Sequence, residues 1–289
     1  FGKLLPIQIE AIPIVLQRGN AVISSPTASG KTEAVVAPIA ECLLENMTAG
    51  LSVVYVSPTR ALVNDLYERL AGPLCELGLS VAIKTGDRAQ LDPTKPQTFL
   101  LTTPEALDSL ICRSPRVFRT VSFVVLDEIH LVDKTYRGDQ LRIVLRRLRK
   151  LVPKDLHYYA LSATLSGPEE TAERYFDKFA VIAIPGLREL EYELFPSVQQ
   201  ALRAARERKM HKILLFCNSR REVEELSAEC RALWPEDRLV VHHGKLHRSV
   251  REESERFMRE CQWGLCIATM TLEIGIDIGD IDVVVLYGP

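Results

Sequence analysis

The chain has 289 residues, of which 47% are hydrophobic and 26% charged, so it can form the cores of about two globular domains. Its formal net charge of −2 and sequence pI near 6.4 exclude a uniformly basic nucleic-acid-binding protein but allow a local channel of Lys and Arg. No apolar run reaches the length of a membrane span, and the amino terminus has no signal-peptide pattern, so no membrane partner is expected.

Seven cysteines are scattered along the chain without a Cys-x-x-Cys pair, which argues against a zinc knuckle and against a disulfide framework. We therefore expect reduced thiols and a cytoplasmic protein, in a bacterial or archaeal cytosol rather than a nucleus. The chain does not start with methionine and stops just after an apolar run at 283–287. We expect it to be a piece of a longer protein with further domains.

Apolar runs alternate with amphipathic stretches, which predicts an α/β fold with parallel sheets and helices on both faces. In the first part, strands are expected near residues 21, 53, 98, 121, 156 and 181, and helices at 9–17, 33–44, 61–70, 104–111 and 140–151. The last of these helices is rich in Arg and Lys, which we interpret as a solvated charged face.

The polar stretch that starts at Pro185 and Gly186 predicts a linker, followed by a helix at 198–209. A second set of elements is expected at 213–217, 221–233, 239–242, 250–261, 263–268 and 283–287. The predicted organisation is a first RecA-like domain at 1–185, a linker and leading helix at 186–210, and a second RecA-like domain at 211–289, truncated at its C-terminal end.

Residues 25–32 read Ser-Pro-Thr-Ala-Ser-Gly-Lys-Thr between the first strand and the following helix, the context of a phosphate-binding P-loop. Backbone N–H groups of such a loop surround the phosphates, while the lysine reaches the outer phosphates and the final hydroxyl binds Mg²⁺. The predicted nucleotide and metal contacts are Thr27, Ala28, Ser29, Gly30, Lys31 and Thr32. A chance Gly-Lys-Thr is the alternative, because Ala28 replaces a common glycine.

Asp127 and Glu128, in the segment Leu-Asp-Glu-Ile-His at 126–130, follow an apolar run and so lie at the end of a buried strand, where carboxylates are costly. A magnesium-nucleotide site needs one acid for the metal and another to deprotonate the attacking water. We assign Asp127 to the metal and Glu128 as the base. The alternative, an acidic pair that caps the next helix, is weakened by the P-loop upstream.

The Asp-Glu-x-His box after a P-loop resembles the superfamily 2 helicases, and further motifs follow in that family's order. By this resemblance Gln8 is the adenine-reading glutamine of a Q motif, which makes ATP the expected nucleotide. The loops of motif Ia, the glycine motif and motif Ib would hold the nucleic-acid backbone through Pro58, Thr59, Arg60, Gly86, Thr103 and Pro104. His130, Ser162 and Thr164 would couple the ATP site to the nucleic acid.

The motifs in the second half of the chain are each weak evidence for the family, but their order along the chain is strong evidence. The resemblance implies that Asn218, Ser219, Arg220, His243, Gly244 and Thr269 contact nucleic acid. It also implies that Gly275 lies near the ATP phosphates and that Asp277 meets the ribose. In this family, ATP binds between the two RecA-like domains. No segment resembles the arginine-rich motif VI, so we expect slow hydrolysis by this piece alone.

The P-loop, the Asp-Glu-Ile-His box with Arg137 and Gly138, and residues 272–280 together look most like Lhr-type and related large DNA-repair helicases. That resemblance implies ATP- and Mg²⁺-dependent movement along single-stranded or partly duplex nucleic acid, with DNA favoured over RNA and a 3′ to 5′ direction. A Ski-type RNA helicase and a nuclease or restriction translocase that does not unwind stay open. A degenerate binding module is disfavoured by the intact Lys31, Asp127 and Glu128.

Overall fold

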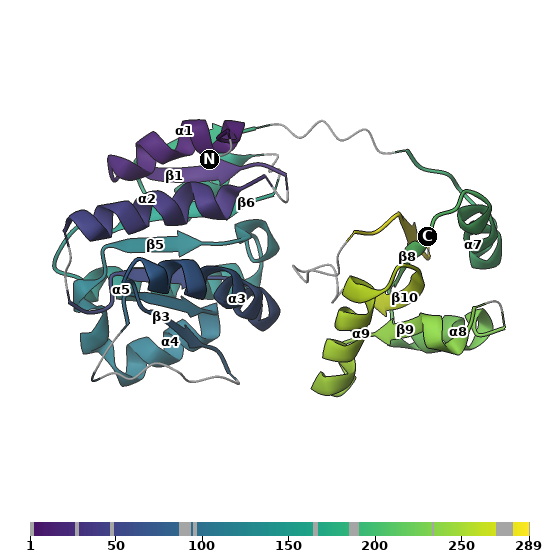
Figure 1. Cartoon of the computed structure of the whole chain (residues 1–289). Helices are drawn as coiled ribbons and strands as arrows, with labels where there is room; N and C mark the ends of the chain where they lie inside the picture. The colour runs from purple at the N-terminus through teal and green to yellow at the C-terminus, as the bar shows by residue number, and fades with distance from the viewer. Residues whose placement is uncertain are drawn as a thin grey trace. The chain divides into compact units, whose positions relative to one another are not determined.

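The computed structural model of the protein describes residues 3–26, 29–46, 49–86, 94, 97–163, 167–184, 191–232, 234–269 and 280–288. The chain divides into two compact units, Phe1–Arg188 and Glu189–Pro289 (Figure 1). Each unit is built on an all-parallel sheet with helices on both faces, so the predicted α/β class with two parallel-sheet domains is confirmed.

The first unit has a seven-stranded sheet in the order β3-β4-β2-β5-β6-β1-β7. Its strands are β1 (Asn20–Ser24), β2 (Val53–Val56), β3 (Val81–Lys84), β4 (Phe99–Thr102), β5 (Phe123–Leu126), β6 (His157–Ser162) and β7 (Phe179–Ala183). Alternate side chains of a strand enter opposite cores, as Val53 and Tyr55 do on one face and Val54 and Val56 on the other. Because both faces are covered, the inner strands have mainly apolar side chains on both sides, as in β5 with Phe-Val-Val-Leu.

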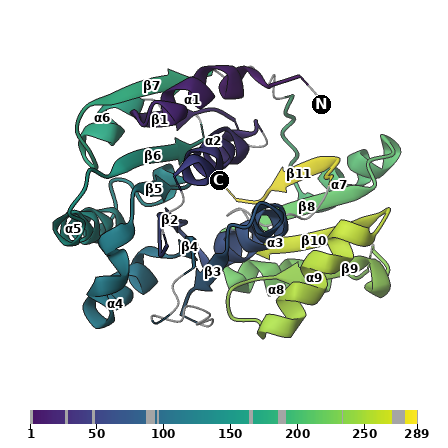
Figure 2. The ribbon, with the colours of Figure 1, turned by 60° about the vertical axis from the view of Figure 1, so that its left-hand side comes forward.

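The helices of the first unit form two layers. Helices α1 (Pro6–Leu16), α2 (Lys31–Glu45) and α3 (Arg60–Glu76) supply one core, whereas α4 (Pro104–Arg113), α5 (Tyr136–Leu151) and α6 (Pro168–Glu173) supply the other. Figure 2 shows α2 and α5 on opposite sides of the strands. Short 3₁₀ turns lie at Pro115–Thr120 and Ile129–Leu131. Thr59, Thr103 and Thr135 cap α3, α4 and α5 by accepting backbone N–H bonds.

Strand β3 and helix α6 were not predicted from the sequence, and several helix ends differ from their predicted positions, two of them by four residues or more. β3 is a four-residue strand and α6 is a six-residue helix, too short to give a clear period. Helix α3 continues through Gly72 and Pro73 because Leu74 beyond them is buried in the core. Helix α5 begins at Tyr136, four residues earlier than expected, because Thr135 caps it.

The basic side chains of α5 pair with acids at the surface. Arg142 pairs with Asp139, Arg147 with Asp108, and Arg149 with Asp155 at 3.2 Å. Local ion pairs of this kind at the surface agree with the solvated charged face predicted for this helix.

The second unit has a four-stranded parallel sheet in the order β11-β8-β10-β9. Its strands are β8 (Lys212–Cys217), β9 (Leu239–His242), β10 (Gly264–Thr269) and β11 (Val283–Leu286), with a 3₁₀ turn at Glu236–Arg238. Helices α7 (Val198–Glu207) and α8 (Arg220–Cys230) pack on one face, and α9 (Arg248–Glu260) packs on the other. The helix expected after the linker is α7, and its apolar side forms part of this unit's core.

All seven cysteines are free, as the sequence predicts. Among the helices of the described residues, none combines the length and the apolar character that a membrane crossing requires.

A pair of glycine variants tests the packing of the first unit. A Cβ at Gly138 would lie 2.4 Å from the backbone oxygen of Val132 and 2.9 Å from the Tyr175 hydroxyl, so Gly138→Ala should lower the free energy of unfolding. The expected loss is about 1–3 kcal/mol. Gly72 has open space around its Cβ position inside α3, so Gly72→Ala should instead stabilise by roughly 0.5–1 kcal/mol. Urea denaturation measures the free energy of unfolding of both variants, which should change in opposite directions. Equal changes would contradict the close packing around Gly138.

Candidate nucleotide and nucleic-acid site

The carboxyl edge of the first sheet gathers the predicted nucleotide-binding segments. Strands β5, β6 and β1 are neighbours in the sheet, and each is followed by one motif. The P-loop follows β1, the Asp-Glu-Ile-His box follows β5, and Ser162 ends β6. Residues about 100 positions apart in sequence therefore meet at one edge, which is where ligands bind in open parallel sheets.

Lys31 is held by the P-loop itself. Its ammonium group donates to the backbone oxygens of Ser25 at 2.7 Å and Pro26 at 2.8 Å, and the residue is only 7% exposed. Burial lowers the pKa of Lys31, and the carboxylates of Glu128 and Asp127 act against that shift. An ammonium with carbonyl partners at a helix N-terminus is well placed to exchange them for phosphate oxygens.

Gly30 and Gln8 fit against each other. Gly30 has φ +81°, a conformation that glycine adopts without strain, and a Cβ there would lie 2.7 Å from Gln8 Nε2 and 2.9 Å from Leu5 Cδ1. The Gln8 amide donates to the Gly30 oxygen at 3.5 Å and accepts from the Leu5 N–H at 3.0 Å. The predicted Q motif thus lies beside the P-loop, and its reading of adenine stays a prediction.

Asp127 and Glu128 lie where the sequence predicts them, directly after β5. Asp127 is 8% exposed and accepts the Glu128 N–H at 3.0 Å. Burial, reinforced by the adjacent Glu128 charge, raises the pKa of Asp127 to about 7. Glu128 has φ +41°, a conformation unfavourable for a non-glycine residue and often found at functional sites.

His130 connects the acid pair to the end of β6. Its Nδ1 lies 3.1 Å from Ser162 Oγ and 3.3 Å from Glu128 Oε2, and it accepts the Ala163 N–H at 3.4 Å. Burial lowers the pKa of His130, while the Glu128 charge acts in the opposite direction. A neutral ring suits the Ala163 N–H, which needs an acceptor. The structure brings His130 and Ser162 together, and their coupling role stays a prediction.

A pocket opens between these motifs and helix α3. Besides the P-loop and the two acids, it is lined by Glu33, Leu62, Asp65, Leu66 and Arg69. The sequence analysis missed Arg69, whose guanidinium lies 3.1 Å from Asp65 and 3.6 Å from Glu33. Residues 62, 65, 66 and 69 have the spacing of one helix face. This spacing was the sequence signal that could have placed Arg69 beside the nucleotide motifs.

The predicted nucleic-acid loops lie on the other half of the same edge. Strands β2, β4 and β3 are adjacent there, and they lead to Thr59, Thr103 and Gly86. The hydroxyls of Thr59 and Thr103 are engaged as helix caps, at 3.3 Å from the Leu62 N–H and 3.4 Å from the Ala106 N–H. Each hydroxyl still has its own hydrogen to donate, and the N-terminal N–H groups of α3 and α4 are further donors for phosphates.

Two further residues of this half have defined surroundings. Arg60 covers Gly86, where a Cβ would lie 2.8 Å from the guanidinium. Pro104 is the first residue of α4 and is buried. The nucleic-acid contacts predicted for Pro58, Arg60 and Pro104 stay predictions.

In the second unit the predicted residues follow β8, β9 and β10. Ser219 caps α8, Asn218 is exposed and donates its N–H to Glu222 at 2.9 Å, and Arg220 pairs with Glu224 at 2.8 Å. His243 is buried and lies 3.7 Å from Glu224, so nucleic acid would meet the backbone of His243 and Gly244 rather than the imidazole. Thr269 ends β10. Thr27, Ala28, Thr164, Gly275 and Asp277 lie outside the described residues.

The residues that are described fit a magnesium-nucleotide ligand. Two adjacent carboxylates, one buried deeply enough to raise its pKa to about 7, are stabilised by a divalent cation. Asp127 and the Thr32 hydroxyl are the oxygen donors that would hold Mg²⁺, and the ion would neutralise phosphate charge. Lys31 and the start of α2 would hold the phosphates.

A parallel sheet with a P-loop and an acid pair at its carboxyl edge defines a P-loop NTPase. The family profile described as DEAD/DEAH box helicase matches residues 5–172, and the profile described as helicase conserved C-terminal domain matches residues 194–289. The chain belongs to the DEAD/DEAH box helicase family.

Individual relatives support the Lhr-type resemblance. The chain is 31% identical to ATP-dependent helicase Lhr-Core protein 2 of Thermococcus barophilus over 100% of this chain and 39% of that protein. It is 30% identical to ATP-dependent helicase Lhr-Core of Saccharolobus solfataricus over 99% of this chain and 38% of that protein. The chain therefore spans about two fifths of the length of these relatives, and the Lhr-type resemblance is confirmed.

Solved structures show the same fold. Mycobacterium smegmatis helicase Lhr, bound to ssDNA and AMP-PNP, matches with a TM-score of 0.83 and 26% identity over 99% of this chain and 42% of that chain. Mss116p matches with a TM-score of 0.83 and 20% identity over 100% of this chain and 65% of that chain, which shows the fold alone.

The Lys31→Ala substitution tests the nucleotide site. Removing a buried ammonium from a phosphate-binding loop should weaken ATP binding about tenfold or more, since one hydrogen bond to a charged group contributes about 1.5–3 kcal/mol. Titration with a fluorescent ATP analogue measures the affinity, and the unfolding midpoint serves as the folding control. Unchanged affinity in a folded variant would remove Lys31 from the site.

Proposed function

We propose that this chain is the motor part of an ATP-dependent helicase or translocase, in which ATP hydrolysis with Mg²⁺ drives 3′ to 5′ movement along single-stranded DNA. One observation carries the proposal: Lys31 and the acid pair share a sheet edge with the helix N-termini that follow motifs Ia and Ib. A site for a triphosphate and a site for a phosphate backbone therefore lie on one rigid scaffold.

The chemistry assigned to the residues follows from their surroundings. Lys31 and the P-loop N–H groups bind the phosphates, Thr32 and Asp127 hold Mg²⁺, and Glu128 orients and deprotonates the attacking water. Glu128 suits the role of base because it lies directly beside the metal residue and faces His130 at 3.3 Å. Bound Mg²⁺ supplies charge neutralisation at the phosphates.

We infer DNA as the nucleic acid from the relatives. The structure of the M. smegmatis relative contains ssDNA and AMP-PNP, and that relative is 26% identical over almost all of this chain. The 3′ to 5′ direction follows from the Lhr-type resemblance. In this proposal residues 1–185 are the ATP-binding domain, 186–210 the linker and leading helix, and 211–289 the helicase C-terminal domain.

The Glu128→Gln variant tests the assignment of the base. It keeps the size and the backbone position of the side chain but cannot accept a proton, so ATP binding should persist and turnover should fall about 10²- to 10⁴-fold. Single-turnover hydrolysis and ATP-analogue binding, measured on one preparation, separate the two effects. Turnover equal to that of the wild type would show that another group is the base.

The substrate is tested by steady-state ATP hydrolysis of the full-length protein with no nucleic acid, with single-stranded DNA or with single-stranded RNA. Stimulation by DNA supports the proposal, and stimulation by RNA alone would replace it with an RNA helicase. The Lys31→Ala variant sets the background. Lys31-dependent turnover that neither nucleic acid stimulates would contradict a nucleic-acid motor.

A further inference from the structure

The segment that follows the Asp-Glu-Ile-His box occupies a special place in the first unit. Strand β5 lies between β2 and β6, so it borders the nucleic-acid half of the sheet edge on one side and the ATP half on the other. Residues 133–138, which comprise the end of the turn after the box and the first three residues of helix α5, make side-chain contacts in both directions. The inference below rests on the proposed function and concerns these contacts.

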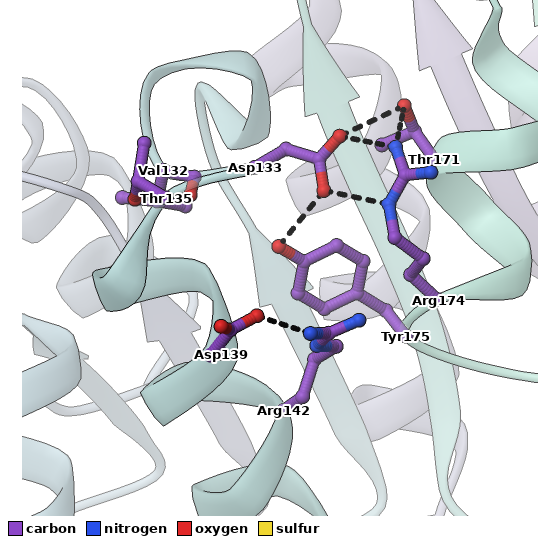
Figure 3. Close-up of polar contacts among 8 residues, drawn as sticks. All are labelled: Val132, Asp133, Thr135, Asp139, Arg142, Thr171, Arg174 and Tyr175. Carbon is purple, nitrogen blue, oxygen red and sulfur yellow. Dashed lines mark hydrogen bonds and ion pairs between the residues drawn. The ribbon is translucent and has the colours of Figure 1, made fainter.

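On the ATP side, Asp133 is held by residues in and just after helix α6, the helix that follows β6. Figure 3 shows its carboxylate facing Arg174, Tyr175 and Thr171, all from α6 or just after it. The Arg174 guanidinium donates from Nε at 2.9 Å and also from Nη2, and the hydroxyls of Tyr175 and Thr171 each donate at 3.3 Å.

The Asp133 carboxylate stays ionised in this position. Only 8% of its side chain is exposed, and burial alone would raise the pKa, but the hydrogen bonds and charge of Arg174 and the Tyr175 bond hold it below its ordinary value. A buried carboxylate with four donated bonds is a rigid anchor. It fixes helix α6 to a residue only three positions beyond His130.

On the nucleic-acid side, Arg137 holds the starts of two helices at once. Its Nε donates to the Glu105 carboxylate at 2.8 Å, and its Nη2 donates to the Pro58 backbone oxygen at 2.6 Å. Pro58 immediately precedes the cap of α3, and Glu105 lies in the first turn of α4. One guanidinium therefore sets the spacing of the two N-termini that would contact successive phosphates.

The two clamps are joined by tight local packing. Thr135 donates to the Val132 oxygen at 2.5 Å and accepts the Gly138 N–H at 3.4 Å. A Cβ at Gly138 would collide with the Val132 oxygen at 2.4 Å and the Tyr175 hydroxyl at 2.9 Å, so the start of α5 lies directly against the Asp133 cluster. A displacement of Asp133 therefore displaces Arg137 as well.

We propose that residues Asp133–Gly138 are a positioning link that carries the nucleotide-dependent state of the Asp-Glu-Ile-His box to the phosphate-contacting starts of α3 and α4. Asp133 is the positioning residue on the ATP side and Arg137 on the nucleic-acid side. The link acts in addition to the contact between His130 and Ser162, and it needs no group outside the first unit.

The experiment measures the affinity of the full-length protein for a fluorescent single-stranded DNA with and without a non-hydrolysable ATP analogue. The ratio of the two affinities is the coupling factor, typically 5- to 150-fold in coupled systems. In Arg137→Ala this factor should fall at least fivefold, whereas ATP-analogue affinity without DNA should stay within about twofold. Arg137→Lys should also lose coupling, because lysine lacks the fork that reaches both partners.

The chain offers a matched control on the same helix. Arg149, near the other end of α5, pairs with Asp155 at the surface at 3.2 Å. Arg149→Ala removes the same charge and should leave the coupling factor unchanged. On the ATP side, Tyr175→Phe removes one bond to Asp133 without changing the ring and should lower the coupling factor about twofold or more.

The outcomes separate this inference from the proposed function. If Arg137→Ala weakens DNA binding equally with and without the analogue, Arg137 is only a docking determinant and the inference is wrong. The inference is also wrong if the wild-type protein binds DNA with the same affinity with and without the ATP analogue, even when DNA still stimulates its ATP hydrolysis. If the wild-type protein hydrolyses ATP no faster than the Lys31→Ala variant, the proposed function itself is wrong.

Discussion

Charged groups that are buried beside one another at the carboxyl edge of a parallel sheet are the constraint on which this structure depends. Lys31 and Asp127 are each less than a tenth exposed, and neither charge is stable there alone. The two carbonyls from the P-loop, the Asp127 bond to the Glu128 N–H and the attraction between opposite charges compensate part of the desolvation. The strand order that brings β1, β6 and β5 together is what makes this compensation possible.

The division of the sheet edge into two halves would let one domain bind both ligands of the proposed function. The predicted nucleotide motifs follow β1, β6 and β5, and the predicted nucleic-acid motifs follow β2, β4 and β3. In the second half the conspicuous hydroxyls of Thr59 and Thr103 are already used as helix caps. Phosphate contacts from backbone N–H groups would carry no base preference, which would suit the proposed movement along a strand.

Most of the fold and the nucleotide site could be predicted from the sequence because their signals are local. Apolar runs mark the buried strands, and the P-loop and acid pair have fixed spacings. Contacts such as Arg137 with Pro58 or Asp133 with Arg174 join residues tens of positions apart, so no window of sequence contains them. The role of Thr59 as a helix cap could not be predicted either, because the sequence Pro58-Thr59-Arg60 is compatible with both a helix cap and a phosphate contact.

The strand order also has a consequence for how the protein is made. Strand β1 pairs with β6 on one side and with β7 on the other. Residues 20–24 therefore cannot form all their strand pairs until the chain has been synthesised as far as residue 183. At ribosomal speeds of about 5–20 residues per second, the strand that carries the P-loop stays unpaired for roughly ten to thirty seconds. The nucleotide site therefore belongs to the last part of the first unit to form during translation. A chain interrupted before β6 would leave this apolar strand without either neighbour, a strong target for chaperones and proteases.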